Sequence, residues 1–336
     1  MTTPAKIGVM AGRRTNLALL WATLLAALTG VGAFIVGTPP GRWMVVAHGV
    51  VALAIVVLTP WKAVIAARGL RRHPGRALSI ALAAAIPGAL VSGVLLVTGV
   101  VGSLGPFTTM QVHVALGLLA VGLTLVHALQ RPVHHRPTDF ARRSLIRAGG
   151  VLAGAGGIWL VGEAVLDLVG ARGGDRRFTG SHEIVDPSDV PATQWLNDRV
   201  QHLDADRHEV VVLGAPHSVS DIVMGGDEIV ATLDCTGGWF TTQVFAGTRL
   251  ARLLADASGT SILVRSVTGY WRRFPIEHAD RLLLATHMAG EPLRDGNGGP
   301  LRLVAPGRRG YWWVKWVDRI EVDDRPPWWQ PPLPLA

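Results

Sequence analysis

The 336-residue chain is poor in cysteine and in lysine. Its single cysteine, Cys235, excludes a disulfide within the chain, which leaves that thiol for packing, nucleophilic chemistry or metal ligation. Lysine occurs only at positions 6, 62 and 315, so the net charge of +8 comes almost entirely from arginine. In the first half these arginines lie mostly in short segments between apolar runs, which fits membrane topology rather than nucleic-acid binding. We therefore expect no nucleic-acid partner.

Acidic residues are scarce between residues 15 and 170, where Ala, Leu, Val and Gly dominate. Each of the apolar segments in this part is close to or longer than the ~20 residues that cross a bilayer. The segments are residues 16–37, 43–67, 77–101, 111–129 and 145–169. We expect an all-α bundle of five transmembrane helices over residues 1–171. The first segment follows Arg13 and Arg14 as a signal peptide would, but its length and the four later spans indicate an anchor.

The distribution of basic residues predicts the orientation of this bundle. Basic residues concentrate in the segments 6–14, 68–76 and 131–147, whereas the other two loops have one basic residue between them. By the positive-inside rule the N-terminus is cytoplasmic, and five crossings place the C-terminal domain outside the cell. We expect a multi-pass protein of the bacterial cytoplasmic membrane, with the lipid bilayer as a partner.

A pair of arginines precedes the fifth apolar segment. Arg142 and Arg143, followed by the Gly- and Ala-rich residues 148–169, are similar to a twin-arginine export signal placed inside the chain. Such a signal implies that the outer domain acquires a cofactor before it crosses the membrane. The alternative is that these arginines only add to the positive-inside signal.

Histidines are the main ionisable residues inside the apolar segments, where such residues are costly and usually functional. His48 and His113 lie near the outer ends of the second and fourth segments, and His127 follows His113 by 14 positions, about 21 Å along a helix. Two imidazoles from facing helices are a normal axial ligand set for b-type haem. We expect one such haem, held by His48 with His113 or His127. The alternative is that these histidines are interfacial or hydrogen-bonded within the bundle.

Residues 172–325 have the mixed charge and turn signals of an ordinary folded domain. We expect strands at residues 210–213, 229–233, 261–266, 301–305 and 312–317, and helices at 250–256 and 277–284, which together make an α+β domain. Cys235 ends one of the strand-like runs and is followed by a Gly-rich turn, although it could equally be a small buried hydrophobe. Residues 326–336 read as a stiff tail rich in Pro and Trp.

Several runs of this domain occur in the order of one known family. They are residues 232–239, 247–254, 264–270, 274–277 and 297–316. On these runs, residues 178–322 resemble the molybdopterin-binding domain of the sulfite oxidase family. The resemblance implies that Cys235 ligates molybdenum. It also implies that a group of polar and basic residues holds the pterin phosphate and ring, namely Ser266, Asn297, Arg302 and Lys315, with Ser181 and His182 as a further pterin-contacting segment.

The chemistry of two of these residues agrees with that role independently. Arg302 and Lys315 flank a loop rich in Gly and Pro, where backbone N–H groups can approach a phosphate. Two features depart from the sulfite-oxidising members, in which Ala or Gly, Asn and Arg follow the cysteine. Here Thr236 and two glycines follow it, and Trp312–Trp313 replace a basic residue before Lys315. A positively charged pocket for sulfite is therefore in doubt.

These observations favour a membrane-anchored molybdopterin-dependent oxidoreductase. It would carry out two-electron oxygen-atom transfer on a small oxo or sulfur substrate, and its membrane half would exchange electrons with a quinone or another carrier. The arrangement is similar to methionine sulfoxide reductase, with its membrane cytochrome b and its molybdenum subunit fused in one chain. Two alternatives stay open: a non-catalytic membrane protein whose outer domain is a degenerate binding module, and an enzyme whose membrane half is only an anchor.

Overall fold

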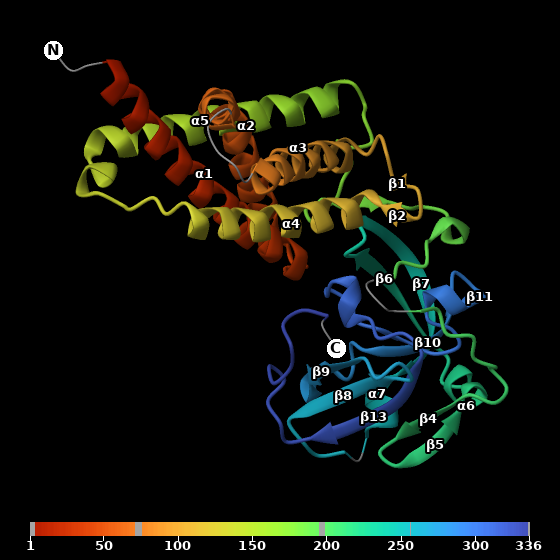
Figure 1. Ribbon diagram of the computed structural model, residues 1–336. Helices are drawn as coiled ribbons and strands as arrows, with labels where there is room; N and C mark the ends of the chain where they lie inside the picture. Colours follow the sequence, from red (N-terminus) through yellow and green to blue (C-terminus); the bar gives the residue numbers. More distant parts are fainter. Residues whose placement is uncertain (1–3, 71–75, 195–198, 256, 335–336) are drawn as a thin grey trace. The chain divides into compact units, whose positions relative to one another are not determined.

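The structure is a computed structural model that describes residues 4–70, 76–194, 199–255 and 257–334 (Figure 1). Contacts divide the chain into two units. The helical unit comprises Met1–Phe34 and Pro39–His182, and the sheet unit comprises Ile35–Thr38 and Glu183–Ala336. The expected boundaries at residues 171/172 and 325/326 stay predictions. By contacts, residues 172–182 go with the helices, and the C-terminal tail goes with the sheets.

Five long apolar helices make up most of the helical unit. Each has the length and composition of a membrane span, which confirms the five predicted segments and suggests a multi-pass membrane protein. Helix α3 packs along α4, and α2 packs along α5. The helices are α1 (Pro4–Ile35), α2 (Arg42–Leu70), α3 (Arg76–Thr98), α4 (Thr109–Gln130) and α5 (Arg142–Leu168), with short connecting elements η1 (Pro39–Gly41), β1 (Ser103–Leu104), β2 (Phe107–Thr108) and η2 (Pro137–Phe140).

The ends of these helices are held by polar contacts. Thr108 caps α4 with a reciprocal pair of hydrogen bonds, since its hydroxyl accepts from the Gln111 backbone and the Gln111 side chain accepts from the Thr108 backbone. Arg13 on α1 donates to Asp139 in the segment before α5 and to the backbone carbonyl of His134 at 3.0 Å. Residues 71–75 of the second predicted basic segment lie outside the described residues. The orientation of the bundle stays a prediction.

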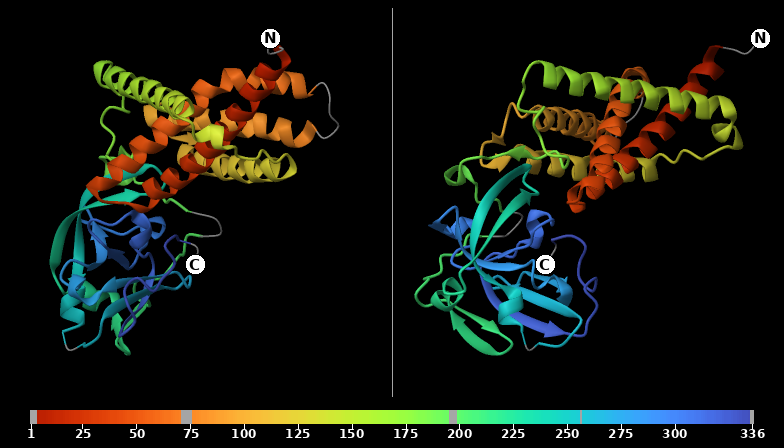
Figure 2. Two further views of the ribbon diagram at one scale, coloured as in Figure 1. Left: turned by 90° about the vertical axis from the view of Figure 1, so that its left-hand side faces the viewer. Right: turned by 180° about the vertical axis from the view of Figure 1, so that it is seen from behind.

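Two β-sheets form the sheet unit. One has six strands in the order β11–β10–β7–β3, with β12 paired to β10 and β6 paired to β7, and the other has the order β5–β4–β13–β8–β9. Strands β6 and β7 are antiparallel partners, and the long curved green-to-teal strands of Figure 2 belong to this part of the chain. The strands are β3 (His182–Glu183), β4 (Glu209–Val212), β5 (Ala215–Ser218), β6 (Asp227–Cys235), β7 (Trp239–Arg249), β8 (Ser261–Ser266), β9 (Trp271–Pro275), β10 (Leu283–Met288), β11 (Glu291–Pro292), β12 (Arg302–Val304) and β13 (Val317–Asp323).

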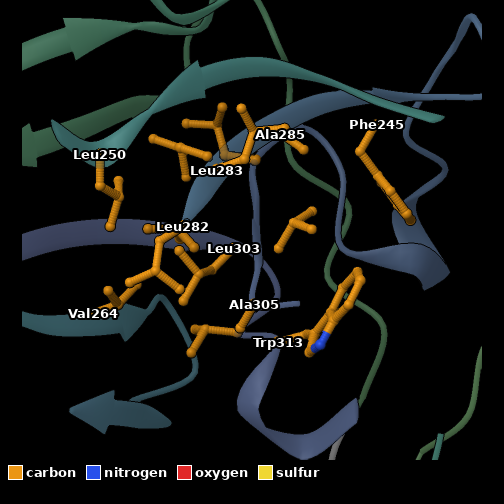
Figure 3. Close-up of a cluster of buried hydrophobic side chains, with 14 of the residues drawn as sticks. Phe245, Leu250, Val264, Leu282, Leu283, Ala285, Leu303, Ala305 and Trp313 are labelled. Atoms are coloured by element: carbon orange, nitrogen blue, oxygen red, sulfur yellow. The ribbon is translucent and has the colours of Figure 1, made fainter. Parts of the chain in front are cut away.

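Helices are few and short in this unit, as expected for a sheet-rich α+β domain. They are α6 (Val219–Val223), α7 (Leu250–Leu253) and the 3-10 turns η3 (Pro187–Asp189), η4 (Ile276–His278), η5 (Asp295–Asn297) and η6 (Gly310–Trp312). The core lies between strands of both sheets, where Phe245 of β7 meets Trp313 edge to face at 5.4 Å between ring centroids (Figure 3). Val264 of β8 and Leu283 of β10 are fully buried in the same cluster. Burying one such side chain stabilises the fold by roughly 1.5–3 kcal/mol.

Two local predictions in this unit are wrong. Residues 277–284 form one 3-10 turn and the start of β10 rather than a helix, because Leu283 and Leu284 lie between β7 and β12 and are fully buried there. Residues 312–317 do not form a continuous strand, because they comprise the end of η6, an isolated bridge between Lys315 and Arg302, and only the first residue of β13. The strand β7, with 11 residues, is absent from the predicted set. Tertiary pairing therefore overrides local pattern at residues 277–284 and along β7.

Candidate cofactor-binding cavity

A cavity of about 650 Å³ opens in the sheet unit. Cys235 and the four residues predicted to hold a pterin from the C-terminal runs all line it, although they come from four separate parts of the sequence. The wall of the cavity is completed by polar, aromatic and small residues, which include Thr193, Arg199, Thr236, Trp239, Thr268, Tyr270, Gly310, Tyr311, Trp313 and Pro334. The fold therefore brings Cys235, Ser266, Asn297, Arg302 and Lys315 together at one site.

Cys235 is presented by the tight turn between β6 and β7. It pairs with Trp239, so that residues 236–238 form the turn, and the Gly238 N–H donates to the Cys235 carbonyl at 3.2 Å. Gly238 has φ +91°, a conformation that glycine adopts readily. The Gly237 N–H donates to Cys235 Sγ at 3.3 Å. The sulfur is half-buried and is held by a backbone N–H, so its position at the cavity wall is defined.

A buried ion pair fixes the backbone beside this sulfur. The Arg309 guanidinium donates to the Asp234 carboxylate, and both side chains are almost completely buried. Residues 234 and 309 also form an isolated parallel bridge. The next residue must be small, because a Cβ on Gly310 would lie 3.0 Å from Cys235 Cα and 3.2 Å from the Asp234 carbonyl oxygen. The segment 309–310 thus holds the end of β6 in place.

Two buried donors in the cavity wall have no partner among the described residues. Asn297 ends η5, Arg302 begins β12, and the Arg302 Nη1 donates to the Asn297 carbonyl at 2.7 Å. The Asn297 Nδ2 and the Arg302 Nε make no hydrogen bond, although the two residues are 3% and 4% exposed. An unsatisfied buried donor costs about 1–3 kcal/mol. A ligand with hydrogen-bond acceptors would remove that cost at both atoms.

Arg302 keeps its charge despite its burial. Its guanidinium lies over the Trp313 ring at 5.5 Å from the centroid. Burial lowers the pKa of Arg302 to about 10, while the neighbouring Cys235 acts to raise it. The side chain is therefore a cation at neutral pH, and it faces the same cavity as the thiol. A buried cation of this kind favours an anionic ligand group.

Lys315 and Ser266 complete the predicted set from two further elements. Lys315 Nζ donates to the carbonyls of Gly296 at 2.9 Å and Thr193 at 3.2 Å, which directs its stem along the η5 loop. A Cβ on Gly298, which has φ +101°, would lie 3.0 Å from the Lys315 side chain. Ser266 ends β8, and its hydroxyl accepts from the Thr268 N–H at 3.3 Å.

The combined donor set fits a molybdopterin group. Cations and backbone amides suit a phosphate, the unpaired Asn297 and Arg302 donors suit acceptor atoms of a ring system, and a soft thiolate suits a metal such as molybdenum. The wall also contains residues outside the predicted set, among them Arg199, Tyr270 and Tyr311. Tyr270 lies in the same run as Ser266 and could have been included on that ground. Tyr311 likewise lies in the run 297–316 with Lys315. Arg199 has no local signal and reaches the cavity only through the tertiary fold.

The structure places Ser181 and His182 elsewhere. Both are buried, and neither lines the cavity as far as the chain is described. His182 belongs to the helical unit, where its Nε2 donates to the Leu96 carbonyl at 2.6 Å and burial lowers the pKa of the ring. A Cβ on Gly99 would lie 2.8 Å from the His182 ring. Their role in pterin binding stays a prediction.

In the helical unit, His48 of α2 and His113 of α4 lie next to each other. Their ring centroids are 5.8 Å apart, and the rings are perpendicular. The Nδ1 of His48 lies 2.8 Å from the Ala26 carbonyl, and that of His113 lies 2.9 Å from the Ala89 carbonyl. Hydrogen bonds of this type fix the tautomer that leaves Nε2 as an acceptor, as in metal-ligating histidines. Among the described residues, no group of three or more His, Cys, Asp or Glu could hold a metal ion.

Comparison with known proteins agrees with the geometry of the cavity. Residues 199–329 match the family model of the oxidoreductase molybdopterin binding domain. The mitochondrial sulfite oxidase of Rattus norvegicus is 28% identical over 166 residues, and that of Homo sapiens is 29% identical over 165 residues. Each match covers 37% of this chain and 30% of the relative. The NADPH nitrate reductase of Mycosarcoma maydis is 46% identical over 50 residues, which are 15% of this chain and 5% of that protein.

Among solved structures, the sulfane dehydrogenase SoxCD from Paracoccus pantotrophus is 25% identical over 38% of this chain and 40% of that chain, with a TM-score of 0.35. The chain spans less than a third of the length of the curated relatives that it matches. The C-terminal part of the chain therefore contains a molybdopterin-binding domain of the sulfite oxidase family. The predicted fold class, a bundle of five apolar helices followed by this sheet-rich domain, is confirmed.

Proposed function

We propose that the protein is a membrane-anchored molybdopterin-dependent oxidoreductase that acts on a small oxo or sulfur substrate. One observation carries the proposal. The only cysteine of the chain lines the same cavity as two buried donors that have no partner among the described residues, Asn297 Nδ2 and Arg302 Nε. Such atoms are costly in a domain that binds nothing, and a bound pterin would pair with them.

Each residue of the cavity has a distinct task in this proposal. Cys235 Sγ is the protein ligand of the metal, held by the Gly237 N–H. Arg302 and Lys315 hold the phosphate, and Asn297 and Ser266 bond the pterin ring. When bound, the molybdenum cofactor supplies two-electron oxygen-atom transfer. The aromatic walls of the cavity limit the access of water to the reacting atoms, since Trp239 and Trp313 are buried there and Tyr270 is half-buried.

The membrane half exchanges electrons with a quinone or another carrier in this proposal. The close pair of His48 and His113 supports a b-type haem, because each ring has its Nδ1 at a backbone carbonyl and both Nε2 atoms remain available as axial ligands. His127 lies on α4 with His113 and is not part of this pair. The export signal at Arg142 and Arg143, an extracytoplasmic sheet unit and a bacterial cytoplasmic membrane belong to the same proposal.

The second candidate is a non-catalytic membrane protein whose sheet unit is a degenerate binding module. The turn after Cys235 favours it, because Thr236 and two glycines stand where sulfite-oxidising members have other residues. The unpaired donors of Asn297 and Arg302 argue against it, since a module without pterin gains nothing from them. The reduced-minus-oxidised absorbance of the purified chain decides whether the membrane half is only an anchor.

The proposal is tested by turnover of the purified full chain in both directions. Reduced benzyl viologen would be the electron donor for dimethyl sulfoxide and methionine sulfoxide, and ferricyanide the acceptor for sulfite. We expect reduction of a sulfoxide by the wild type and none by Cys235→Ser. The control is Thr232→Ser, because Thr232 lies on the same strand and its exposed hydroxyl bonds that of Thr242, an interaction that serine can keep. A wild type that carries molybdenum but turns over none of these compounds would contradict the proposed substrate class.

A further inference from the structure

We propose that residues 330–334 form a strap that closes one side of the cavity and limits which molecules reach Cys235. Pro334 lines the cavity, although these residues lie almost 100 positions after Cys235 in the sequence. The claim about access concerns the protein alone. The claim that the strap selects substrates rests on the proposed function.

The strap is attached to the sheet unit at successive residues. The Gln330 side chain bonds the backbone of Arg273 on β9 in both directions, since its Oε1 accepts from the Arg273 N–H at 3.1 Å and its Nε2 donates to the Arg273 carbonyl at 2.8 Å. The carbonyl of Pro331 accepts from Arg272 Nη1 at 2.8 Å. The amide side chain of Gln330 thus pairs with the exposed edge of β9 much as the backbone of a neighbouring strand would. These contacts give the strap a defined path along the sheet unit.

Arg272 links this strap to the wall of the cavity. It is 1% exposed, and its guanidinium carbon lies 5.0 Å from the ring centroid of Tyr270 and 5.1 Å from that of Tyr311. Its Nε donates to the Tyr270 hydroxyl at 2.6 Å, and that hydroxyl donates to the Tyr311 carbonyl at 2.5 Å. Both tyrosines line the cavity. One side chain therefore positions two cavity residues and the strap together.

The composition of the strap favours a fixed wall. Three of its five residues are proline, at positions 331, 332 and 334. Proline fixes φ near −65°, so such a segment loses little conformational entropy when it is held against the domain. The hydrogen bonds at Gln330 and Pro331 then suffice to direct the residues that follow them toward the cavity. Because the strap narrows the opening of the cavity, it hinders the access of large molecules to Cys235 more than that of small ones.

The single thiol makes the inference testable without any substrate. Cys235 is the only cysteine, so every thiol-reactive label on the chain reports this site. The full chain purified without molybdopterin would be labelled with iodoacetamide, which is small, and with fluorescein maleimide, which is bulky. The test variants are a truncation after Gln330 and Arg272→Lys. The matched control is Trp328→Ala, because Trp328 precedes the strap and is 73% exposed.

We expect the truncation to raise the rate of labelling by the bulky reagent several-fold and to change the rate of the small reagent much less. Arg272→Lys keeps the charge but loses the planar fork that bonds both Tyr270 and Pro331, so it should have the same effect in weaker form. Trp328→Ala should match the wild type with both reagents. Near-ultraviolet circular dichroism separates a loosened strap from an unfolded domain, and Gln330→Ala gives a second variant that removes no backbone.

Equal increases in the labelling rates of the two reagents, or no increase in either rate, would contradict the proposed strap. These outcomes do not depend on molybdenum, so they are distinct from a failure of the proposed function. In the molybdenum-loaded chain, the truncation should raise turnover of a bulky aryl sulfoxide relative to dimethyl sulfoxide. An unchanged ratio with increased thiol labelling would keep the strap as a barrier and remove its role in selecting substrates.

Discussion

The guanidinium of Arg309 and the carboxylate of Asp234 form an ion pair that is shielded from solvent and lies directly beside Cys235. The side chains are 2% and 4% exposed, and the Arg309 Nη2 also reaches the Cys235 carbonyl at 3.5 Å. The pair connects the end of β6 to the segment before η6. It therefore holds the backbone of the proposed metal ligand at the residue before it and at its own carbonyl.

Removing one partner of this ion pair should destabilise the sheet unit strongly. Asp234→Ala leaves the Arg309 charge buried, and breaking a buried pair in this way costs about 3–5 kcal/mol. Denaturant unfolding in detergent, followed by tryptophan fluorescence, would measure the loss. The double variant Asp234→Leu with Arg309→Leu should recover most of it, because no isolated charge remains. A loss below about 1 kcal/mol, which is typical of surface pairs, would contradict the burial of the pair.

Asn297→Ala should separate cofactor binding from folding. The Nδ2 donor makes no hydrogen bond to the described residues, so the removal of this costly buried group offsets the lost packing. The free energy of unfolding of the cofactor-free chain should therefore change by less than about 1 kcal/mol. The pterin content of the purified chain, measured by fluorescence after oxidation, should fall clearly. Thr232→Ser again serves as the control. If stability falls while pterin content is unchanged, the donor serves the fold rather than a ligand.

The histidine pair predicts which substitutions remove haem. His48→Ala and His113→Ala should each abolish the reduced-minus-oxidised absorbance bands of a b-type haem, because the two rings are neighbours with a centroid distance of 5.8 Å. His127→Ala is the matched control on the same helix and should keep the bands. Wild-type protein without any such band would leave the membrane half as an anchor. Loss of the bands in His127→Ala alone would assign the ligand pair differently.

Acid should weaken the helical unit through Asp139. The Arg13 guanidinium beside Asp139 lowers the pKa of that carboxyl to about 2, and the Arg136 N–H bonds the same group at 2.9 Å. The pKa of this carboxyl is thus lower in the folded chain than the ~3.9 of an unfolded one. The stabilisation is present above pH ~4 and is lost as the pH falls toward ~2. Asp139→Asn should lack this part of the pH dependence.

The measurement for this prediction is the thermal midpoint in detergent at about pH 6 and about pH 3. The wild type should lose more of its midpoint between these values than Asp139→Asn does. Asp175→Asn is a suitable control, since Asp175 also lies in the helical unit outside the spans. Equal losses in the wild type and Asp139→Asn would show that other carboxyls govern the acid response.

Much of the architecture can be predicted from the sequence, because its strongest signals are long apolar segments rather than short motifs. Five apolar segments of membrane length can hardly form anything but helices, and all five are present. Short runs were less informative. Residues 277–284 have the composition of a helix. Leu283 and Leu284 nevertheless begin strand β10, because they pair with Arg249 and Thr248 of β7 on one side and with β12 on the other. Local pattern does not contain that pairing.

The residues of the candidate site can be predicted where they lie in sequence runs that follow the family order, and cannot be predicted where they lie outside such runs. Cys235, Ser266, Asn297, Arg302 and Lys315 belong to such runs, and the fold brings them to one cavity. Arg199 and Pro334 reach the same cavity from segments without any motif. The Arg309–Asp234 pair was also missed, because residues 75 positions apart show no relation until β6 and the segment before η6 are placed side by side.

Molybdenum content tests the central claim most directly. The full chain, purified from cells that make molybdopterin, should contain about one molybdenum per chain by elemental analysis, as one thiolate ligand implies. Cys235→Ser should lose the metal while circular dichroism shows the fold retained, and Thr232→Ser should keep it. A wild-type chain with an intact fold but no molybdenum, or a Cys235→Ser chain with full molybdenum content, would contradict the account.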